Sequence, residues 1–348
     1  MSIETEHKIE TYFLENSGGS KLSLINYGGR IINLEVPDRN GKFGNVVLNL
    51  SEEDYLKPNP FIGALIGRYA NRIANASFRL NGETYEVDKN EGENCLHGGI
   101  GGFDTVFWNV EKLSESKVVL SYDSLHLEMG FPGNLKVKVY YELTDANELK
   151  ISYRAISDME TIINLTQHSY FNLTADFNKN IEDHVVLINA DSFLPISGTI
   201  PTGEFRALAN DVFDFRKPKK IIAEINQNEQ QLETAGGYDH CFILNKENNK
   251  DLSFAASAYD PETGRFLEVF TTEPGMQFYT GNSLDGSLKI PNQTGNYKKR
   301  SGFCFETQHF PDSPNRPDFP SVILQAGEEF SSETIYKFSV KTEESDKV

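Results

Sequence analysis

A chain of 348 residues is long enough for two average domains or for one large all-β domain. Its 33 Lys and Arg residues against 51 Asp and Glu residues give a formal net charge of −18, which disfavours nucleic acid and anionic membranes as partners. Three cysteines do not resemble a disulfide framework, the charged start at 1–10 does not resemble a signal peptide, and no apolar run approaches the ~20 residues of a membrane helix. We therefore expect a soluble, cytoplasmic protein that binds a neutral small molecule.

The strand predictions follow a period-two alternation of apolar and polar residues that recurs along the whole chain. In chain order, the predicted strands lie at 23–25, 46–50, 77–80, 118–122, 135–143, 149–155, 185–190, 252–258, 266–271, 277–280, 302–308 and 335–340. Turn signals such as Asn81-Gly82 and Asp285-Gly286 separate several of them. Helical periodicity is confined to the short segments 52–57 and 221–231, and it carries no βαβ rhythm.

This spacing of strands and turns is typical of an antiparallel sandwich or barrel. No linker rich in Gly, Ser or Pro divides the chain, and the alternation keeps its character through the middle. We predict a single all-β domain over residues 1–348, with a frayed charged tail at 343–348.

Glu306 lies in the β-like run 302–308, where alternation places Phe303 and Phe305 on one face and Cys304 and Glu306 on the other. A carboxylate on an apolar strand is seldom buried unless a cation or a chemical task accompanies it. Glu306 is therefore a candidate for acid–base chemistry.

Two histidines are candidate partners for this carboxylate. His168 lies in the run 165–173, where alternation predicts a polar face shared with Tyr170; a satisfied structural histidine is the alternative explanation. The pKa of imidazole lies near neutrality, so His168 can serve as an acid without large tuning. His97 precedes Gly98-Gly99, and its glycine-rich loop is either a plain turn or a place where the backbone approaches a ligand closely.

Three further polar residues are candidates for binding hydroxyl groups. Asn71 and Arg72 offer several hydrogen-bond donors, whereas a structural ion pair is the alternative explanation for Arg72 and for its neighbour Arg68. Asp239 follows Gly236-Gly237 at the junction between a loop and a strand. It either forms a turn or accepts hydrogen bonds from two ligand hydroxyls.

A zinc site can be imagined from three pairs of residues, Cys95-x-His97, Asp239-x-Cys241 and Cys304-x-Glu306. Structural zinc normally uses close Cys-x-x-Cys pairs, and the sequence holds no such pair. We therefore expect no metal centre.

Taken together and in this order, the segments around these residues resemble the aldose 1-epimerase family, whose members are also called galactose mutarotases. The motifs span roughly 28–334 and are Gly67-Arg68-Tyr69-Ala70-Asn71-Arg72-Ile73, Leu96-His97-Gly98-Gly99, His168-Ser169-Tyr170-Phe171-Asn172-Leu173, Tyr238-Asp239-His240, Thr272-Glu273-Pro274-Gly275-Met276-Gln277-Phe278-Tyr279-Thr280-Gly281-Asn282 and Phe305-Glu306-Thr307-Gln308. Their joint occurrence in order is far more specific than any one of them.

The resemblance implies a large antiparallel β-sandwich of the galactose mutarotase type, a supersandwich. It also implies an isomerase, monomeric or homodimeric, that interconverts the α and β anomers of free aldohexoses such as galactose and glucose. Glu306 matches the catalytic base and His168 the catalytic acid, and the sugar-binding positions are matched by Asn71, Arg72, His97, Asp239 and Gln277. No cofactor is required in the family generally; calcium, suspected for some bacterial members, is left open by the acid-rich loops.

The chemistry explains why these residue types are wanted. Ring opening removes a proton from the anomeric hydroxyl and delivers one to the ring oxygen, so the site needs both a base and an acid, expected here as a Glu306 carboxylate and a protonated His168. An apolar floor under the sugar is also expected, and Phe278, Tyr279 and Tyr170 are its candidates.

Three alternatives remain open on the sequence alone. A hexose-6-phosphate 1-epimerase would need an extra cationic cluster, which the acidic balance disfavours. A non-catalytic sugar-binding protein of the same fold would be expected to lack the acid or the base, and both are present. A glycoside hydrolase using Asp239 and Glu306 is chemically conceivable, but the neighbouring His168 and the resemblance disfavour it.

Overall fold

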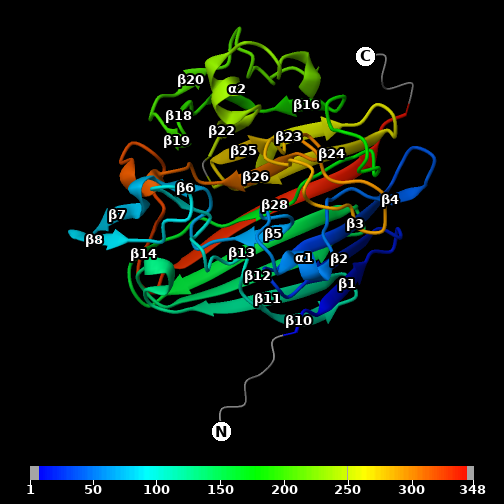
Figure 1. Ribbon diagram of the computed structural model, residues 1–348. Helices are drawn as coiled ribbons and strands as arrows, with labels where there is room; N and C mark the ends of the chain where they lie inside the picture. Colours follow the sequence, from blue (N-terminus) through cyan, green and yellow to red (C-terminus); the bar gives the residue numbers. More distant parts are fainter. Residues whose placement is uncertain (1–7, 249, 343–348) are drawn as a thin grey trace.

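The largest sheet of the computed structural model has nine antiparallel strands and crosses the whole molecule (Figure 1). The model describes residues 8–248 and 250–342. The order of strands across this sheet is β10 (Asn109–Ser114), β11 (Lys117–Ser124), β12 (Leu135–Leu143), β13 (Glu148–Ser157), β28 (Glu329–Val340), β24 (Arg265–Thr271), β23 (Ser253–Tyr259), β16 (Val185–Ile188) and β21 (Lys219–Lys220).

Smaller sheets pack around the large one. A five-stranded sheet has the order β20 (Arg206–Ala207), β17 (Ala190–Phe193), β22 (Asp239–Leu244), β25 (Gly275–Tyr279) and β26 (Cys304–Gln308). A four-stranded sheet near the N-terminus has the order β1 (Thr11–Glu15), β2 (Lys21–Ile25), β3 (Ile31–Pro37) and β4 (Phe43–Asn45).

Short strand pairs and helices complete the described part of the chain. The pairs are β5 (Ala64–Ile66) with β15 (Thr166–His168), β6 (Arg72–Ile73) with β9 (Cys95–Leu96), β7 (Ser77–Leu80) with β8 (Glu83–Glu86), β14 (Thr161–Ile162) with β27 (Ile323–Leu324), and β18 (Ile196–Ser197) with β19 (Ile200–Pro201). The helices are α1 (Glu52–Tyr55) and α2 (Gln230–Ala235), and the 3-10 turns are η1 (Ala74–Ala76), η2 (Glu128–Gly130), η3 (Ile221–Ala223) and η4 (Ser313–Asn315).

The main core lies between the large sheet and the four- and five-stranded sheets. In β12, every second residue from Leu135 to Leu143 is buried, as the alternation predicts. These side chains share one apolar cluster with Ile151, Tyr336 and Phe278, which come from β13, β28 and β25. Each buried aliphatic or aromatic side chain stabilises such a core by about 1.5–3 kcal/mol. The core therefore fixes the strands that carry the polar residues described below.

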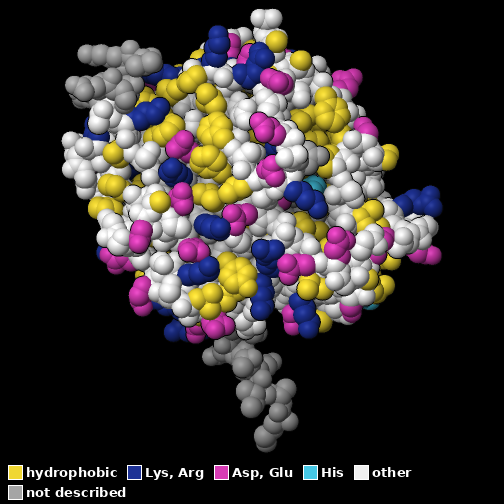
Figure 2. Space-filling model, turned by 180° about the vertical axis from the view of Figure 1, so that it is seen from behind, with side chains coloured by type: hydrophobic (Ala, Val, Ile, Leu, Met, Phe, Trp, Pro, Cys, Tyr) yellow, Lys and Arg dark blue, Asp and Glu magenta, His cyan; other side chains and the backbone are white. Residues whose placement is uncertain are grey.

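The outer face of the large sheet is polar and mixed in charge. Cross-strand ion pairs join Lys150 to Glu333 at 2.8 Å and Arg154 to Glu329 at 3.2 Å. On the side of the molecule shown in Figure 2, basic and acidic side chains are interspersed with scattered hydrophobic ones. None of the helices described is long and apolar enough to cross a membrane.

Most predicted strands are present, but the predicted strand at 46–50 is wrong. β4 ends at Asn45, whose side-chain oxygen accepts hydrogen bonds from the amides of Leu34 and Val47 at 2.9 and 3.1 Å. These bonds replace a strand ladder, and Val47 forms only an isolated bridge with Phe171. The apolar alternation here belongs to a buried loop.

The predicted helix at 221–231 is also wrong as a single element. The structure has η3 at its start and α2 at its end, separated by non-helical backbone. Glu229 is extended and caps α2, because its side chain accepts from the amides of Gln231 and Leu232. The single domain over 1–348 stays a prediction, and the tail at 343–348 lies outside the described residues.

Candidate active site

All seven residues predicted for the site line one cavity of about 330 Å³. They come from β6, the loop after β9, β15, β22, β25 and β26, and are Asn71, Arg72, His97, His168, Asp239, Gln277 and Glu306. The volume lies within the range of about 300–1,000 Å³ that is usual for small-molecule sites. The fold thus brings together segments that are up to 235 positions apart, from Asn71 to Glu306.

Three neighbouring strands of the five-stranded sheet present the acidic side of this cavity. Gln277 on β25 lies directly opposite Glu306 on β26. Its Nε2 donates a hydrogen bond of 2.7 Å to Oδ1 of Asp239, the first residue of β22. Because side chains alternate along a strand, Phe278 and Phe305 point instead into the main core. The predicted two faces of the run 302–308 are therefore confirmed.

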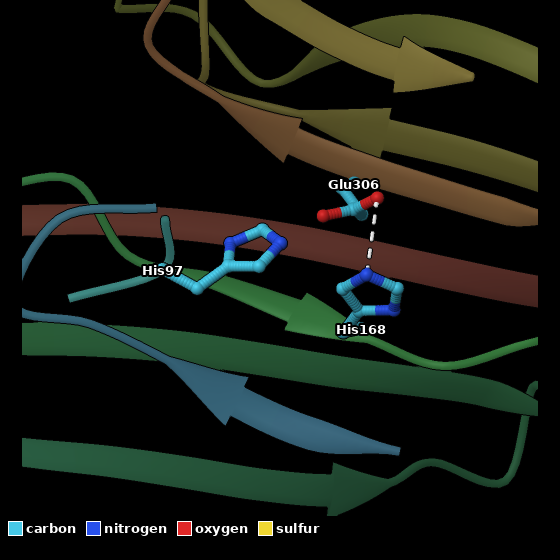
Figure 3. A group of neighbouring side chains, drawn as sticks. All are labelled: His97, His168 and Glu306. Atoms are coloured by element: carbon cyan, nitrogen blue, oxygen red, sulfur yellow. Dashed lines mark ion pairs between the residues drawn. The ribbon is translucent and has the colours of Figure 1, made fainter. Parts of the chain in front are cut away.

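Glu306 and His168 form a pair of a carboxyl group and an imidazole in the cavity. Oε1 of Glu306 lies 3.6 Å from Nε2 of His168, and both side chains are almost fully buried. Figure 3 shows the two groups pointing toward one another, with the ring of His97 beside them. Nδ1 of His168 lies 3.5 Å from Sγ of Cys304, and its ring stacks on Tyr170 with ring centres 5.0 Å apart.

Burial favours the uncharged form of both members of this pair. It raises the pKa of Glu306 well above its usual range; the negative charge of Asp239 adds to this rise and the positive charge of Arg72 opposes it. Burial lowers the pKa of His168 to about 3. Burial therefore opposes the charged pair expected from the sequence, a Glu306 carboxylate beside a protonated His168, and favours the uncharged form of each group.

His97 is held as a hydrogen-bond donor toward the cavity. Its backbone has φ of +54°, and the loop continues through Gly98 with φ of +91°. The amide of Asn71 donates to Nδ1 of His97 at 3.0 Å, so in the neutral ring the proton lies on Nε2. Burial lowers the pKa of His97 well below its usual value, which keeps the ring neutral. Asn71 thus acts on His97 through its backbone, in addition to lining the cavity with its side chain.

Arg72 enters the cavity as half of an ion pair. Its Nε and Nη2 donate to the two carboxylate oxygens of Glu91, both at 2.7 Å. Its neighbour Arg68 is instead buried away from the cavity, where it donates to the backbone oxygens of Ser124, Leu125, Pro132 and Gly133. Arg68 therefore has a structural role through these carbonyl groups, and the ion pair offered as the alternative explanation is found for Arg72.

Aromatic rings line the cavity beside the polar groups. Tyr279 and Phe61 both contribute to its wall. Tyr170 also does so, but it is 1% exposed and its hydroxyl donates to the carbonyl oxygen of Pro60. Phe278 is fully buried in the main core, so its candidacy for the floor of the site is wrong.

A metal centre fits this arrangement poorly. His97, His168 and Glu306 offer three ligand atoms within 4.8 Å of one another. A neutral histidine binds a metal through its unprotonated nitrogen, while the other nitrogen donates a hydrogen bond. In His97 the amide of Asn71 occupies the lone pair of Nδ1, so Nε2 carries the proton and has no lone pair for a metal. The three pairs imagined for zinc do not converge either, because Cys95 and Cys241 lie in separate apolar clusters.

Glu91, Phe61 and Cys304 complete the surroundings of the site and were not predicted in these roles. Alternation places Cys304 on the face of Glu306, but nothing in the sequence indicates its contact with His168. Glu91 lies in the acid-rich stretch 88–94, where no pattern separates it from its neighbours. A search for the partner of Arg72 would have been the one route to it.

The comparison with known families agrees with this geometry. A family model described as aldose 1-epimerase matches residues 10–337. The chain belongs to the aldose 1-epimerase family. Within the aldose 1-epimerase family, galactose mutarotase of Bos taurus is 47% identical over 322 residues, which is 92% of this chain and 91% of the relative. Aldose 1-epimerase of Escherichia coli (strain K12) is 37% identical over 330 residues, covering 93% and 94% of the two chains.

Solved structures related to the aldose 1-epimerase family share the fold. A GalM/aldose epimerase homologue from C. elegans superposes with a TM-score of 0.87 at 27% identity, over 96% of this chain and 100% of that chain. Galactose 1-epimerase from Lactobacillus acidophilus NCFM gives 0.82 at 30% identity, with the same coverage of 96% and 100%. The predicted sandwich of the galactose mutarotase type is confirmed.

Proposed function

We propose that this protein is an aldose 1-epimerase, an isomerase that interconverts the α and β anomers of free aldohexoses such as galactose and glucose. The observation that carries the proposal is the distance of 3.6 Å between Oε1 of Glu306 and Nε2 of His168. The anomeric hydroxyl oxygen and the ring oxygen of a pyranose are bonded to the same carbon atom. A base and an acid that serve these two oxygens must therefore lie within a few ångström of each other.

The proton count of the pair matches the reaction. In its charged form, Glu306 accepts the proton of the anomeric hydroxyl while His168 donates its proton to the ring oxygen. The bond between the anomeric carbon and the ring oxygen breaks, and an open-chain aldehyde forms. After rotation about the bond between C1 and C2, the hydroxyl that was the ring oxygen attacks C1 and gives its proton back to His168. Glu306 returns its proton to the aldehyde oxygen, and the ring closes to the other anomer. No net proton is gained or lost, so the pair needs no external acid or base.

The remaining polar residues hold the hydroxyl groups that do not react. Asp239 accepts hydrogen bonds, and the 2.7 Å bond from Gln277 orients it. Nε2 of His97 and the guanidinium of Arg72 donate hydrogen bonds to sugar oxygens. The side chains of Tyr279 and Phe61 line the cavity and offer apolar surface to the face of the ring.

Charge argues against a phosphorylated hexose as substrate. Arg72 is the single cationic side chain among the residues that line the described cavity, and Glu91 already pairs with it. Glu91, Asp239 and Glu306 would face the phosphate dianion in the same space. A free sugar avoids this repulsion.

Polarimetry tests the proposal directly. Freshly dissolved α-D-galactose and α-D-glucose are followed to equilibrium rotation with wild type, Glu306→Gln and His168→Asn in matched buffer. We expect wild type to speed the approach, and each variant to lose about 10²–10⁴-fold in rate while it remains folded. A wild-type protein that leaves the buffer rate unchanged for both sugars would refute the proposal.

We propose further that the reaction needs no cofactor, because the acid and the base together account for every proton transferred. Dialysis against EDTA should leave the rate unchanged. A loss of rate that calcium restores would contradict this and would assign a role to the acid-rich loops.

A further inference from the structure

We propose that Glu91 is a positioning residue for Arg72: its carboxylate fixes the guanidinium for sugar binding and prevents it from pairing with Asp239 and Glu306. The proposal deepens the function proposed above and rests on it. Glu91 acts through Arg72, and its contribution is to keep both the arginine and the base available to substrate.

Arg72 and Glu91 form a bidentate ion pair. The two carboxylate oxygens of Glu91 accept from Nε and Nη2 of Arg72, each at 2.7 Å, which leaves Nη1 outside the pair. Bidentate pairs of this kind fix direction as well as distance. The Arg72 side chain is 13% exposed and that of Glu91 29%, so solvent weakens the pair only partly.

Glu91 is itself held in place from two other directions. Its backbone amide donates to the carbonyl oxygen of Asn94 at 3.1 Å, and the amide of Asn94 donates back at 3.0 Å. The hydroxyl of Thr199, in the turn between β18 and β19, donates to Oε2 of Glu91 at 3.3 Å. The carboxylate that grips Arg72 therefore stands on a closed turn rather than on a free loop.

Charge explains why such a grip is needed. Arg72 shares the cavity with three carboxylates, those of Glu91, Asp239 and Glu306. Its positive charge acts on the latter two, since it opposes the rise that burial causes in the pKa of Asp239 and of Glu306. Among the described residues, the ion pair of Arg72 is nevertheless with Glu91. Without that partner, the guanidinium would be drawn toward the sugar-binding carboxylate and the base.

The first variant to test is Glu91→Gln, with Glu93→Gln as its matched control. Glu93 lies two positions away, is 79% exposed and pairs with Lys89 on the surface. For Glu91→Gln we expect the KM for galactose to rise about tenfold. We also expect a shift in the acid limb, the low-pH side of the plot of kcat/KM against pH. It should move to lower pH, because the freed charge of Arg72 lowers the pKa of Asp239 and Glu306. Glu93→Gln should match wild type in both.

A second variant separates geometry from charge. Glu91→Asp keeps the negative charge but shortens the reach, so KM should rise while the acid limb stays in place. In an Arg72→Lys background, adding Glu91→Gln should change KM by less than twofold, because Glu91 acts through the guanidinium. If Glu91→Gln fails to fold, Glu91→Asp carries the test on KM.

The failures of the two proposals are distinguishable. If wild type does not catalyse mutarotation, the proposed function fails. If wild type is active and Glu91→Gln matches Glu93→Gln in KM and in the acid limb, Glu91 does not position Arg72. A lower melting temperature without a shift of the limb would show a structural role only, and it would also overturn the inference.

Discussion

Replacing Glu306 by Gln should lower the rate of mutarotation by about 10²–10⁴-fold and at the same time stabilise the protein. Glu306 is 2% exposed, and its Oε2 has no hydrogen-bond partner among the described residues. Burial and the charge of Asp239 raise its pKa, so ionisation of this group costs free energy in the folded state. Glutamine has nearly the same shape and removes that cost.

The expected gain is modest but measurable. An unsatisfied buried polar group costs about 1–3 kcal/mol, and more when it is charged. Glutamine keeps the polar group and removes only the added cost of the charge, for which a further cost of about 1–3 kcal/mol is expected. At about 2.1 cal/mol/K per residue, a chain of 348 residues unfolds with an entropy of about 0.7 kcal/mol/K. A gain of about 1–3 kcal/mol therefore raises the melting temperature by about 1–4 °C.

The pH dependence gives the sharper test. Because the folded pKa of Glu306 is raised, its contribution to stability is complete below the unfolded pKa and is lost as pH rises through the folded pKa. The advantage of the Gln variant should thus widen as pH rises above the unfolded pKa of Glu, about 4.3. Thermal melts by circular dichroism measure it, with exposed Glu111→Gln as control. The reasoning would be refuted if the variant were less stable than wild type at every pH. It would also be refuted if the difference in melting temperature did not change with pH.

Three further outcomes follow from single contacts. Gly98→Ala places a Cβ 2.0 Å from a backbone oxygen and should raise the KM for galactose at least about tenfold. The control Gly82→Ala has open space around it and should leave the KM unchanged. Equal KM values for the two variants would contradict the prediction. Gln277→Leu removes the 2.7 Å hydrogen bond to Asp239 and should weaken galactose binding by about 1.5–3 kcal/mol, as measured by calorimetry. Unchanged binding would contradict this prediction. Burial lowers the pKa of His240 to about 3, so the free energy of unfolding measured in urea should fall as pH drops below about 6.5. His240→Gln should make this fall smaller. Identical pH profiles of stability for wild type and variant would contradict the prediction.

All seven residues predicted for the site line one cavity, whereas the local structure was predicted less completely. Alternation placed Glu306 and Cys304 on one face of a strand, and the structure confirms this because both faces of β26 are packed and a shift of one residue would exchange them. The same alternation failed at 46–50, where side-chain hydrogen bonds from Asn45 compete with the ladder. Periodicity reports burial, and burial alone does not distinguish a strand from a buried loop.

Glu91 could not be predicted for a different reason. Its role depends on a tertiary contact with Arg72 across 19 positions, and no local pattern in the stretch 88–94 marks it. The tautomer of His97 was equally out of reach, since it depends on which backbone amide meets Nδ1. Sequence motifs name the candidate groups for ligand binding, whereas the groups that orient them appear only when the fold is known.

Burial of the acid–base pair also bears on the assignment of roles to its two members. Ring opening with Glu306 as base and His168 as acid starts from the charged pair and ends with both groups neutral beside the open-chain aldehyde. The opposite assignment ends with a carboxylate and an imidazolium beside that aldehyde. Since burial raises the pKa of Glu306 and lowers that of His168, the neutral end state is the more stable one. With Glu306 as base and His168 as acid, the same desolvation that makes Glu306 costly to ionise therefore stabilises the open-chain state relative to the closed ring beside the charged pair.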